Sequence, residues 1–255
     1  MTVTDVNVVK SAIFERPDDA NKGTLGSLLC VCGSYGMAGA AVMSAKGALR
    51  TGIGLAKCAL PRSIYPIVAQ TILESVYYPL SENADGRISK VNVPFLVSES
   101  CKSSATLVGC GLGVCDDTLK IVFSLIENST TPLVLDADAL NCVAKQPEIL
   151  LRKKAPIIIT PHPGEMSRLT GLATPLVNAE RERVALDFAQ KYGVVTVLKG
   201  AGTVIASPNG KVLVNPTGNS GMATGGSGDV LAGMTASILA PVSYTHLRAH
   251  ETGAY

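Results

Sequence analysis

Short apolar runs that alternate with helical patterns constrain the fold of this chain more than any other feature. The runs are rich in Val, Ile and Leu and show no polar alternation, as at residues 27–32 and 105–108. Such runs are typical of parallel strands that helices bury on both faces. The other predicted strands are residues 54–60, 132–135, 157–160 and 194–198, and the predicted helices are residues 38–51, 117–127 and 178–192. The sequence therefore predicts an α/β fold with a mostly parallel, doubly wound sheet.

The pattern changes near the end of the chain. Residues 203–207 and 211–215 flank the turn sequence P-N-G, which predicts a hairpin. A last helix is expected after Asp229. Because no repeat, low-complexity linker or shift of composition interrupts the chain, we expect one domain.

The composition limits the classes of partner. Of the 255 residues, 47% are hydrophobic and only 16% are charged, which indicates a compact globular protein. The net charge is +2 without a long basic run, and four Phe, seven Tyr and no Trp offer few platforms on which bases could stack. We therefore expect no nucleic-acid partner, whereas small anionic ligands stay open.

Membrane and disulfide signals are missing from the sequence. No charge-free stretch of about 18 apolar residues is present, and the N-terminus lacks a basic start followed by a long apolar run. The seven cysteines lie mostly in apolar runs, which is typical of reduced core residues. Neither Cys30-x-Cys32 nor the Cys110 and Cys115 pair has a second ligand pair at zinc spacing. We expect a soluble cytoplasmic protein without a membrane partner or a metal site.

A glycine-rich run at residues 215–233 ends in one acid and then becomes apolar and helical. Gly225, Gly226 and Gly228 let a ligand approach the backbone, and the N–H groups at the start of the helix attract anions. Phosphate is the expected ligand. A carboxylate at Asp229 is unfavourable beside phosphate unless it takes a proton from an attacking hydroxyl. A surface turn with an acidic N-cap would have the same sequence.

Two further strand ends are rich in glycine. Residues 33–41, G-S-Y-G-M-A-G-A-A, open a helix through small side chains, which permits a ligand to approach but also tight helix packing. Residues 109–113, G-C-G-L-G, resemble a fragment of a dinucleotide-binding fingerprint. They lack the full G-x-G-x-x-G and lie in mid-chain, so they argue only weakly for a hydride-transfer site.

One histidine stands just past a predicted strand. His162 lies between two prolines on a stiff, extended backbone, and it is the only histidine outside the last 15 residues. This position favours a hydrogen bond to a sugar, an amide or a phosphate. A solvated histidine on a rigid turn is the alternative. Glu165 could be a second ligand contact or the cap of the next helix.

Two other strand ends are charged. The sequence K-G-A-G-T at residues 199–203 combines a cation, two glycines and a hydroxyl, which suits a nucleotide phosphate, although an ordinary hairpin entry would look the same. Asp136 and Asp138 follow another strand. They could shape a pocket, hold a magnesium-bound water or cap the helix that follows.

Six segments together resemble, in order, the motifs of the NAD(P)H-hydrate dehydratase family. The resemblance covers residues 22–239. The motifs are G-S-Y-G-M-A-G-A-A, V-G-C-G-L-G, L-D-A-D-A-L-N, T-P-H-P-G-E, V-L-K-G-A-G-T and N-P-T-G-N-S-G-M-A-T-G-G-S-G-D-V-L-A-G.

This resemblance implies a ribokinase-like, three-layer α/β/α fold and the repair of hydrated NADH or NADPH. In the family, ADP or ATP drives loss of water from the S epimer of the hydrate. The ring hydroxyl attacks the terminal phosphate and leaves as a phosphate ester, which regenerates NAD(P)H and releases phosphate. Mg²⁺ is expected to arrive with the nucleotide, without a dedicated set of protein ligands. The resemblance also implies a homotetramer and a separate epimerase that converts the R epimer.

The site residues implied by the family lie on neighbouring loops. Asp229 resembles the residue that meets the hydrate and acts as a base. Further contacts to the hydrate are expected at Ala40, Gly111 and His162. Nucleotide contacts are expected at Lys199, Gly200, Ala201, Gly202, Thr203 and Gly228, and the anion hole at Gly225, Gly226, Ser227 and Gly228.

The end of the chain departs from the family pattern. The resemblance stops near Ala240, and residues 241–255 have no amphipathic period and no family motif. We therefore expect a family domain over residues 1–240 without its last helices, followed by a non-native tail. His246 and His250 have the spacing of two metal ligands on a helix, but no third ligand is nearby. Two other functions fit this sequence: a kinase of the same fold that acts on a vitamin-precursor alcohol, and an inactive nucleotide-binding fragment.

Overall fold

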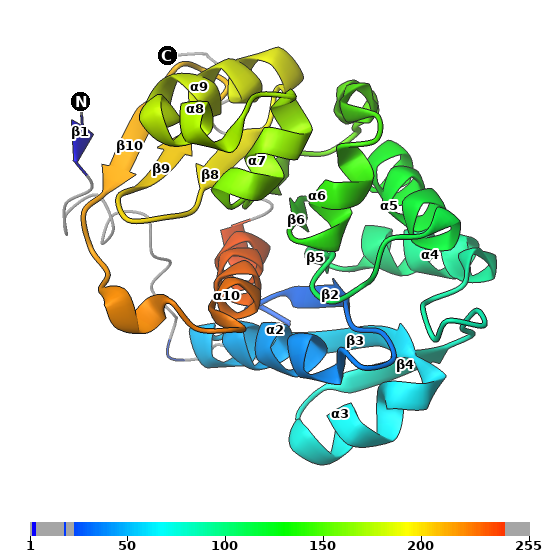
Figure 1. Ribbon diagram of the computed structural model, residues 1–255. Coiled ribbons are helices and arrows are strands. Elements are labelled where there is room, and N and C mark those ends of the chain that lie inside the picture. The colour runs from blue at the N-terminus through cyan, green and yellow to red at the C-terminus, as the bar shows by residue number, and fades with distance from the viewer. Residues whose placement is uncertain (1, 4–17, 19–22, 243–255) are drawn as a thin grey trace, which may run out of the picture.

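The computed structural model describes residues 2–3, 18 and 23–242, and its central feature is one twisted sheet with helices on both faces (Figure 1). The strand order is β1-β10-β9-β8-β7-β6-β5-β2-β3-β4. Neighbouring strands are parallel except at β8–β9 and β9–β10, which are antiparallel. The bounds are β1 Thr2–Val3, β2 Ser27–Val31, β3 Leu55–Pro61, β4 Val76–Leu80, β5 Ala105–Val108, β6 Leu133–Leu135, β7 Ile157–Ile159, β8 Val195–Leu198, β9 Thr203–Ala206 and β10 Val212–Asn215. The predicted doubly wound sheet and its terminal hairpin are confirmed.

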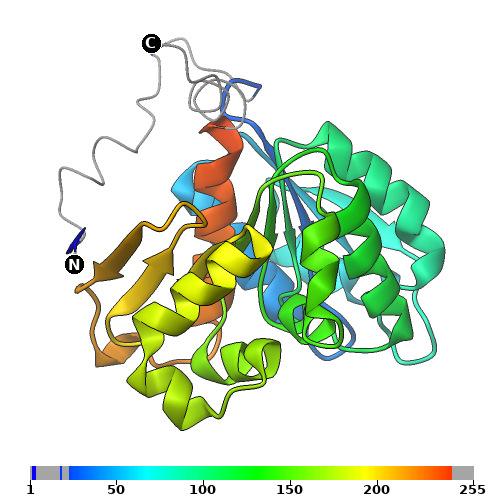
Figure 2. The ribbon, with the colours of Figure 1, turned by 90° about the horizontal axis from the view of Figure 1, so that it is seen from above.

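Helices cover the two faces of the sheet unequally. One face carries α2 (Ala38–Thr51), α3 (Tyr65–Thr71) and α10 (Ser227–Val242), and its apolar side chains form one core cluster. Figure 2 shows α10 on one side of the parallel strands and α4 and α5 on the other. The second face has its own, larger cluster. Its helices are α4 Val93–Lys102, α5 Asp116–Asn128, α6 Asp138–Val143, α7 Pro163–Thr170, α8 Thr174–Ala179 and α9 Arg181–Tyr192, and the 3₁₀ turns of the chain are η1 Arg62–Ile64, η2 Lys90–Asn92, η3 Pro147–Arg152 and η4 Ser220–Met222.

Two parts of the fold differ from the sequence prediction. The predicted helix at residues 178–192 contains all of α9 but only the end of α8, because Glu180, with φ −126° and ψ 40°, separates the two helices. The edge strand β4 was not predicted. It reads V-Y-Y-P-L, in which two tyrosines and a proline replace the Val-, Ile- and Leu-rich run of the predicted strands, and it is exposed or half-buried except at Leu80.

Predictions for the two ends of the chain lie mostly outside the described residues. Residues 243–255 include His246, His250 and nearly all of the expected tail. None of the helices in the described part of the chain has the length and apolar character needed to cross a membrane. All seven cysteines are described and free, and Cys30, Cys32, Cys58 and Cys110 are buried as predicted.

Close packing of α2 against α10 places the end of the glycine-rich run. A Cβ on Gly47 of α2 would lie 2.7 Å from the carbonyl oxygen of Val230, and a Cβ on Gly233 of α10 would overlap the carbonyl oxygen of Ser44. Both glycines therefore allow backbone-to-backbone approach of the two helices. Because Val230 directly follows Asp229, this contact also positions the acid.

Replacing Gly233 with alanine is expected to lower the free energy of unfolding by about 1–3 kcal/mol, because the added methyl group must push α10 away from α2. Urea denaturation of the purified protein measures the change. Gly39→Ala is the matched control in α2, since a Cβ at Gly39 would meet no heavy atom within 4 Å. A Gly233→Ala protein as stable as the control would show that α10 can shift at no cost.

Candidate active site

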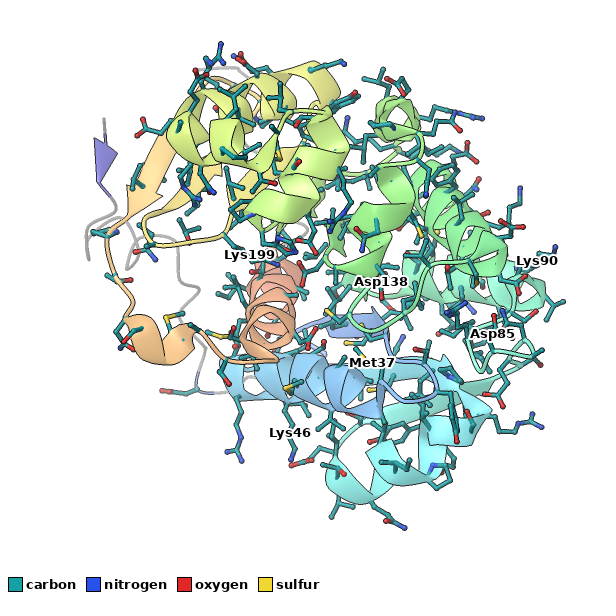
Figure 3. All side chains as sticks on the ribbon, viewed as in Figure 1. Met37, Lys46, Asp85, Lys90, Asp138 and Lys199 are labelled. Carbon is teal, nitrogen blue, oxygen red and sulfur yellow. The ribbon has the colours of Figure 1, made fainter. Side chains whose placement is uncertain are left out.

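Several of the predicted site residues, among them Lys199, Gly228 and Asp229, gather at the carboxyl ends of the parallel strands around the N-terminal end of α10. This is the expected position of a ligand site in a doubly wound sheet. Ala201 and Gly202 instead line a separate cavity beside α9. In Figure 3, Lys199 from the loop after β8, Asp138 from α6 and Met37 from the turn before α2 lie around this end of α10.

A buried ion pair lies at the centre of this group. Lys199 Nζ donates a hydrogen bond to Asp136 Oδ1 at 2.6 Å, and Thr160 Oγ1 donates to the same oxygen at 2.8 Å. Asp136 is only 1% exposed. A carboxylate at such depth is unfavourable unless it is paired and hydrogen-bonded, so the ammonium group of Lys199 is required locally as well as available to a ligand.

His162 and Glu165 begin helix α7 together. His162 Nδ1 accepts hydrogen bonds from the backbone N–H groups of Gly164 at 3.0 Å and Glu165 at 3.3 Å, and Glu165 Oε2 accepts from His162 N at 2.7 Å. This is a capping box with histidine as the N-cap. Glu165 is the N3 residue of this box, so it helps to cap α7, but the N-cap position itself is His162 and not Glu165. Its Oε2 also lies 3.8 Å from Lys199 Nζ. Burial raises the pKa of Glu165, although the attraction of Lys199 opposes the shift.

Asp229 lies in the first turn of α10, next to the ion pair. A carboxylate oxygen of Asp229, a carboxylate oxygen of Asp136 and Cys110 Sγ all lie within 4.8 Å of one another. Burial raises the pKa of Asp229, and the charge of Asp136 adds to the shift, while Cys110 and Lys199 oppose it. A raised pKa brings a carboxylate closer to the range in which a general base works best.

The same three side chains could be considered as metal ligands. Hydrogen bonding to Cys32 and burial raise the pKa of the Cys110 thiol well above its ordinary range, which disfavours the thiolate form that binds metals. The Lys199 ammonium group already neutralises Asp136. The arrangement therefore fits an acid that works beside a fixed cation better than a resident metal.

The glycine-rich run leaves space beside the ion pair. A Cβ on Gly228 would lie 3.6 Å from Lys199 Nζ and 4.0 Å from Asp136 Oδ2. Gly226 has φ +89°, and a Cβ there would overlap the Met43 side chain, whereas a Cβ on Gly225 would meet nothing within 4 Å. Since α10 begins at Ser227, its first N–H groups have no acceptor within the helix.

The predicted hydrate contacts on the other side of the site are also brought together. A Cβ on Gly111, which has φ +62°, would lie 2.7 Å from the Ala40 Cβ. Ser34 Oγ donates a hydrogen bond to the Gly111 carbonyl oxygen at 2.8 Å. His162 comes from the loop after β7, and its side chain is 51% exposed.

Arg181, which was not among the residues predicted from the sequence, holds the start of the loop at residues 199–203. Its Nη2 donates to the carbonyl oxygens of Leu198 at 2.8 Å and Lys199 at 3.1 Å. Beside this loop is an open cavity of about 600 Å³ between residues 178–183, Ala201 and Gly202, and neither Lys199 nor Asp229 lines it. In the sequence Arg181 is one charge in the run E-R-E-R, which reads as a solvated helix face.

The two acids of the loop after β6 face different partners. Asp138 Oδ2 accepts a hydrogen bond from the backbone N–H of Gly113 at 2.8 Å, so its partner is not that of Asp136. The intervening Ala137 has φ 50° and ψ −116°. Of the three uses considered for this pair from the sequence, shaping the pocket agrees best with these contacts.

Comparisons with known proteins point to one family. Residues 28–255 match the family model described as NAD(P)H-hydrate dehydratase. The bifunctional NAD(P)H-hydrate repair enzyme of Thermofilum pendens is 41% identical over 88% of this chain, which spans only 43% of that protein. The ADP-dependent (S)-NAD(P)H-hydrate dehydratase of Neisseria meningitidis is 35% identical over 88% of this chain and 73% of its own length. The crystal structure of the Bacillus subtilis ADP/ATP-dependent NAD(P)H-hydrate dehydratase, co-crystallised with ATP and Mg²⁺, matches with a TM-score of 0.77 and 30% identity over 95% of this chain and 86% of its own.

Proposed function

This chain belongs to the NAD(P)H-hydrate dehydratase family, and we propose that it uses ADP or ATP to dehydrate the S epimer of NADH hydrate or NADPH hydrate. The observation that supports this proposal most is the meeting of Lys199, Gly228 and Asp229 at the start of α10. A cation, an exposed stretch of backbone and an acid with a raised pKa are the groups that phosphoryl transfer to a hydroxyl requires.

In this proposal the terminal phosphate of the nucleotide lies between Lys199 and the N–H groups of residues 225–228. The ring hydroxyl of the hydrate faces Asp229, with Ala40, Gly111 and His162 as its other contacts. Asp229 accepts the hydroxyl proton while the hydroxyl oxygen attacks phosphorus and the bond to the rest of the nucleotide breaks. The ring nitrogen then expels the phosphate ester and restores the reduced nicotinamide. Mg²⁺ bound to the nucleotide would neutralise charge on its phosphates.

An assay on hydrated NADH, with ADP and ATP in parallel, tests the proposal. The expected result is recovery of the reduced-nicotinamide absorbance together with one free phosphate per turnover. A stable phosphorylated product would indicate the small-molecule kinase instead. Binding of nucleotide without turnover of any hydrate would indicate an inactive fragment.

The partners of the reaction follow from the same proposal. The relatives named as bifunctional repair enzymes are more than twice the length that this chain matches. We infer that an epimerase, on another domain or another protein, supplies the S epimer from the R epimer. Assembly into a homotetramer is part of this proposal, and sedimentation of the purified protein tests it.

The pH dependence of the reaction is expected to report the Asp229 carboxyl group. Because burial raises its pKa, kcat/KM should fall on the acid side with a midpoint above that of an ordinary aspartate. The effect of pH on stability has the opposite direction to its effect on activity. Because the pKa of Asp229 is higher in the folded than in the unfolded protein, this carboxyl group stabilises the fold at low pH, and that contribution is lost as the pH rises through the folded-state pKa. A pH–rate profile of Asp229→Glu alongside the wild type checks the assignment, since an unmoved acid limb would assign it to another group.

A further inference from the structure

The two acids of the loop after β6 hold two different loops of the proposed site. Asp136 accepts a hydrogen bond at 2.6 Å from Lys199, which begins the loop at residues 199–203, called here the nucleotide loop. Asp138 accepts a hydrogen bond at 2.8 Å from the N–H of Gly113. Gly113 ends the segment at residues 109–113, called here the hydrate loop, which contains the proposed hydrate contact Gly111. A stretch of three residues is therefore bound to both ligand-binding loops.

The residue between the two acids is strained. Ala137, with φ 50°, is the single non-glycine residue with a positive φ in the part of the chain that the structure describes. Such a conformation persists only where its surroundings hold it. Here Asp136 N donates to Val108 O at 3.1 Å and Asp138 N donates to Gly109 O at 3.3 Å, so both neighbours of Ala137 are bound to the end of β5.

The other carboxylate oxygen of Asp138 is also held by a hydrogen bond. Asn141 Nδ2 donates to Asp138 Oδ1 at 3.3 Å, and Arg168 Nε donates to Asn141 Oδ1 at 2.8 Å. The carboxylate therefore cannot rotate away from Gly113 without breaking these bonds. Both ends of the loop are held, and the strain lies between them.

We propose that residues 136–138 form a brace that couples the nucleotide loop to the hydrate loop, with Asp138 as a positioning residue for both ligands. The inference rests on the proposed function for the identity of those ligands. The contact of Asp136 with Lys199 on one side and that of Asp138 with Gly113 on the other help to hold Ala137 in its strained conformation. Loss of either of these two contacts therefore allows residues 136–138 to relax. The relaxing backbone then moves the other carboxylate together with its partner loop.

Calorimetric titration with ADP tests the coupling without any need for turnover. Asp138→Ala is expected to weaken ADP binding about fivefold, although the hydrogen bonds of Asp138 go to Gly113 and Asn141. Amide exchange at Gly113 should rise in the same variant. In turnover, KM for the hydrate should rise more than kcat falls. Asp187→Ala, at an exposed acid on α9, is the control and should leave ADP binding unchanged.

A second variant isolates the strain. Glycine adopts a positive φ readily, so Ala137→Gly should keep ADP affinity within about twofold of the wild type and raise Tm by about 2–4 °C. In the Ala137→Gly/Asp138→Ala protein, the added effect of Asp138→Ala on ADP binding should fall below about twofold, since there is no strain left to release.

Unchanged ADP affinity in Asp138→Ala, with faster exchange at Gly113, would overturn the brace and leave two independent contacts. If Asp138→Ala does not unfold cooperatively, Asn141→Ala leaves Asp138 in place but removes the amide that links it to Arg168, and it must show the same pattern more weakly, or the inference is wrong. The expected ADP results in a protein that never dehydrates the hydrate would contradict the proposed function and leave the brace standing.

Discussion

Replacing Asp229 with alanine is expected to reduce turnover of the hydrate by about a hundredfold or more, because the attacking hydroxyl loses its proton acceptor. Asp229 lies in the first turn of α10 and its burial raises its pKa, which suits this role. Steady-state assays at saturating nucleotide measure kcat and KM. Asp229→Asn keeps the size of the side chain and should be nearly as slow.

Two controls make this result specific. Asp85→Ala changes an acid that is 67% exposed and should leave turnover within about twofold. ADP affinity of Asp229→Ala should also stay close to that of the wild type, since the loss belongs to the chemical step. Turnover of Asp229→Ala equal to that of the wild type would remove Asp229 from the mechanism and with it the orientation proposed for the hydrate.

Replacing Lys199 with methionine is expected to lower the free energy of unfolding by about 3–5 kcal/mol, because it leaves the Asp136 carboxylate buried without its cation. Lys199 is 18% exposed at its side chain and Asp136 is 2% exposed, so water can replace little of the lost interaction. Chemical denaturation measures the effect. Lys46→Met, at an exposed lysine on α2, should change stability by less than about 0.5 kcal/mol.

A double variant separates the lost pair from the lost packing. Lys199→Met combined with Asp136→Asn removes both charges, so it should be less destabilised than the sum of the two single variants. Simple additivity would mean that the two side chains do not depend on each other. Nucleotide affinity of the single Lys199→Met variant should fall as well, because the proposed site loses its only lysine among the residues expected to contact the nucleotide.

The repetitive parts of the fold could be predicted from the sequence. Unbroken apolar strands, separated by helical patterns, indicated the parallel sheet, and P-N-G indicated the hairpin of β9 and β10. Edge strand β4 has no such run, because as the last strand of the sheet it is mostly exposed or half-buried and carries Pro79 and two tyrosines. The break between α8 and α9 at Glu180 was not predicted either, since a charged helical pattern does not show where a second helix begins.

The location of the candidate site was predictable, but its contacts were not. Loops after parallel strands meet at one edge of a sheet, so glycine and charge at those loops marked the site. The partner of Lys199 could not be read in this way, since Asp136 lies 63 residues away in the chain and competes with three other acids of the region. Arg181 gave no signal because its two acceptors are backbone carbonyl oxygens.

The sequence by itself determined the fold class, the family and the loops on which the site lies, because hydrophobic pattern and glycine spacing are local properties of the chain. Only the tertiary structure decided which acid serves which role. Asp136 and Asp138 look alike in the sequence, yet the strained backbone at Ala137 turns one toward Lys199 and the other toward Gly113. The burial of each carboxylate and the charged groups beside it then determine how strongly it is stabilised. Burial and these neighbours exist only when the chain is folded.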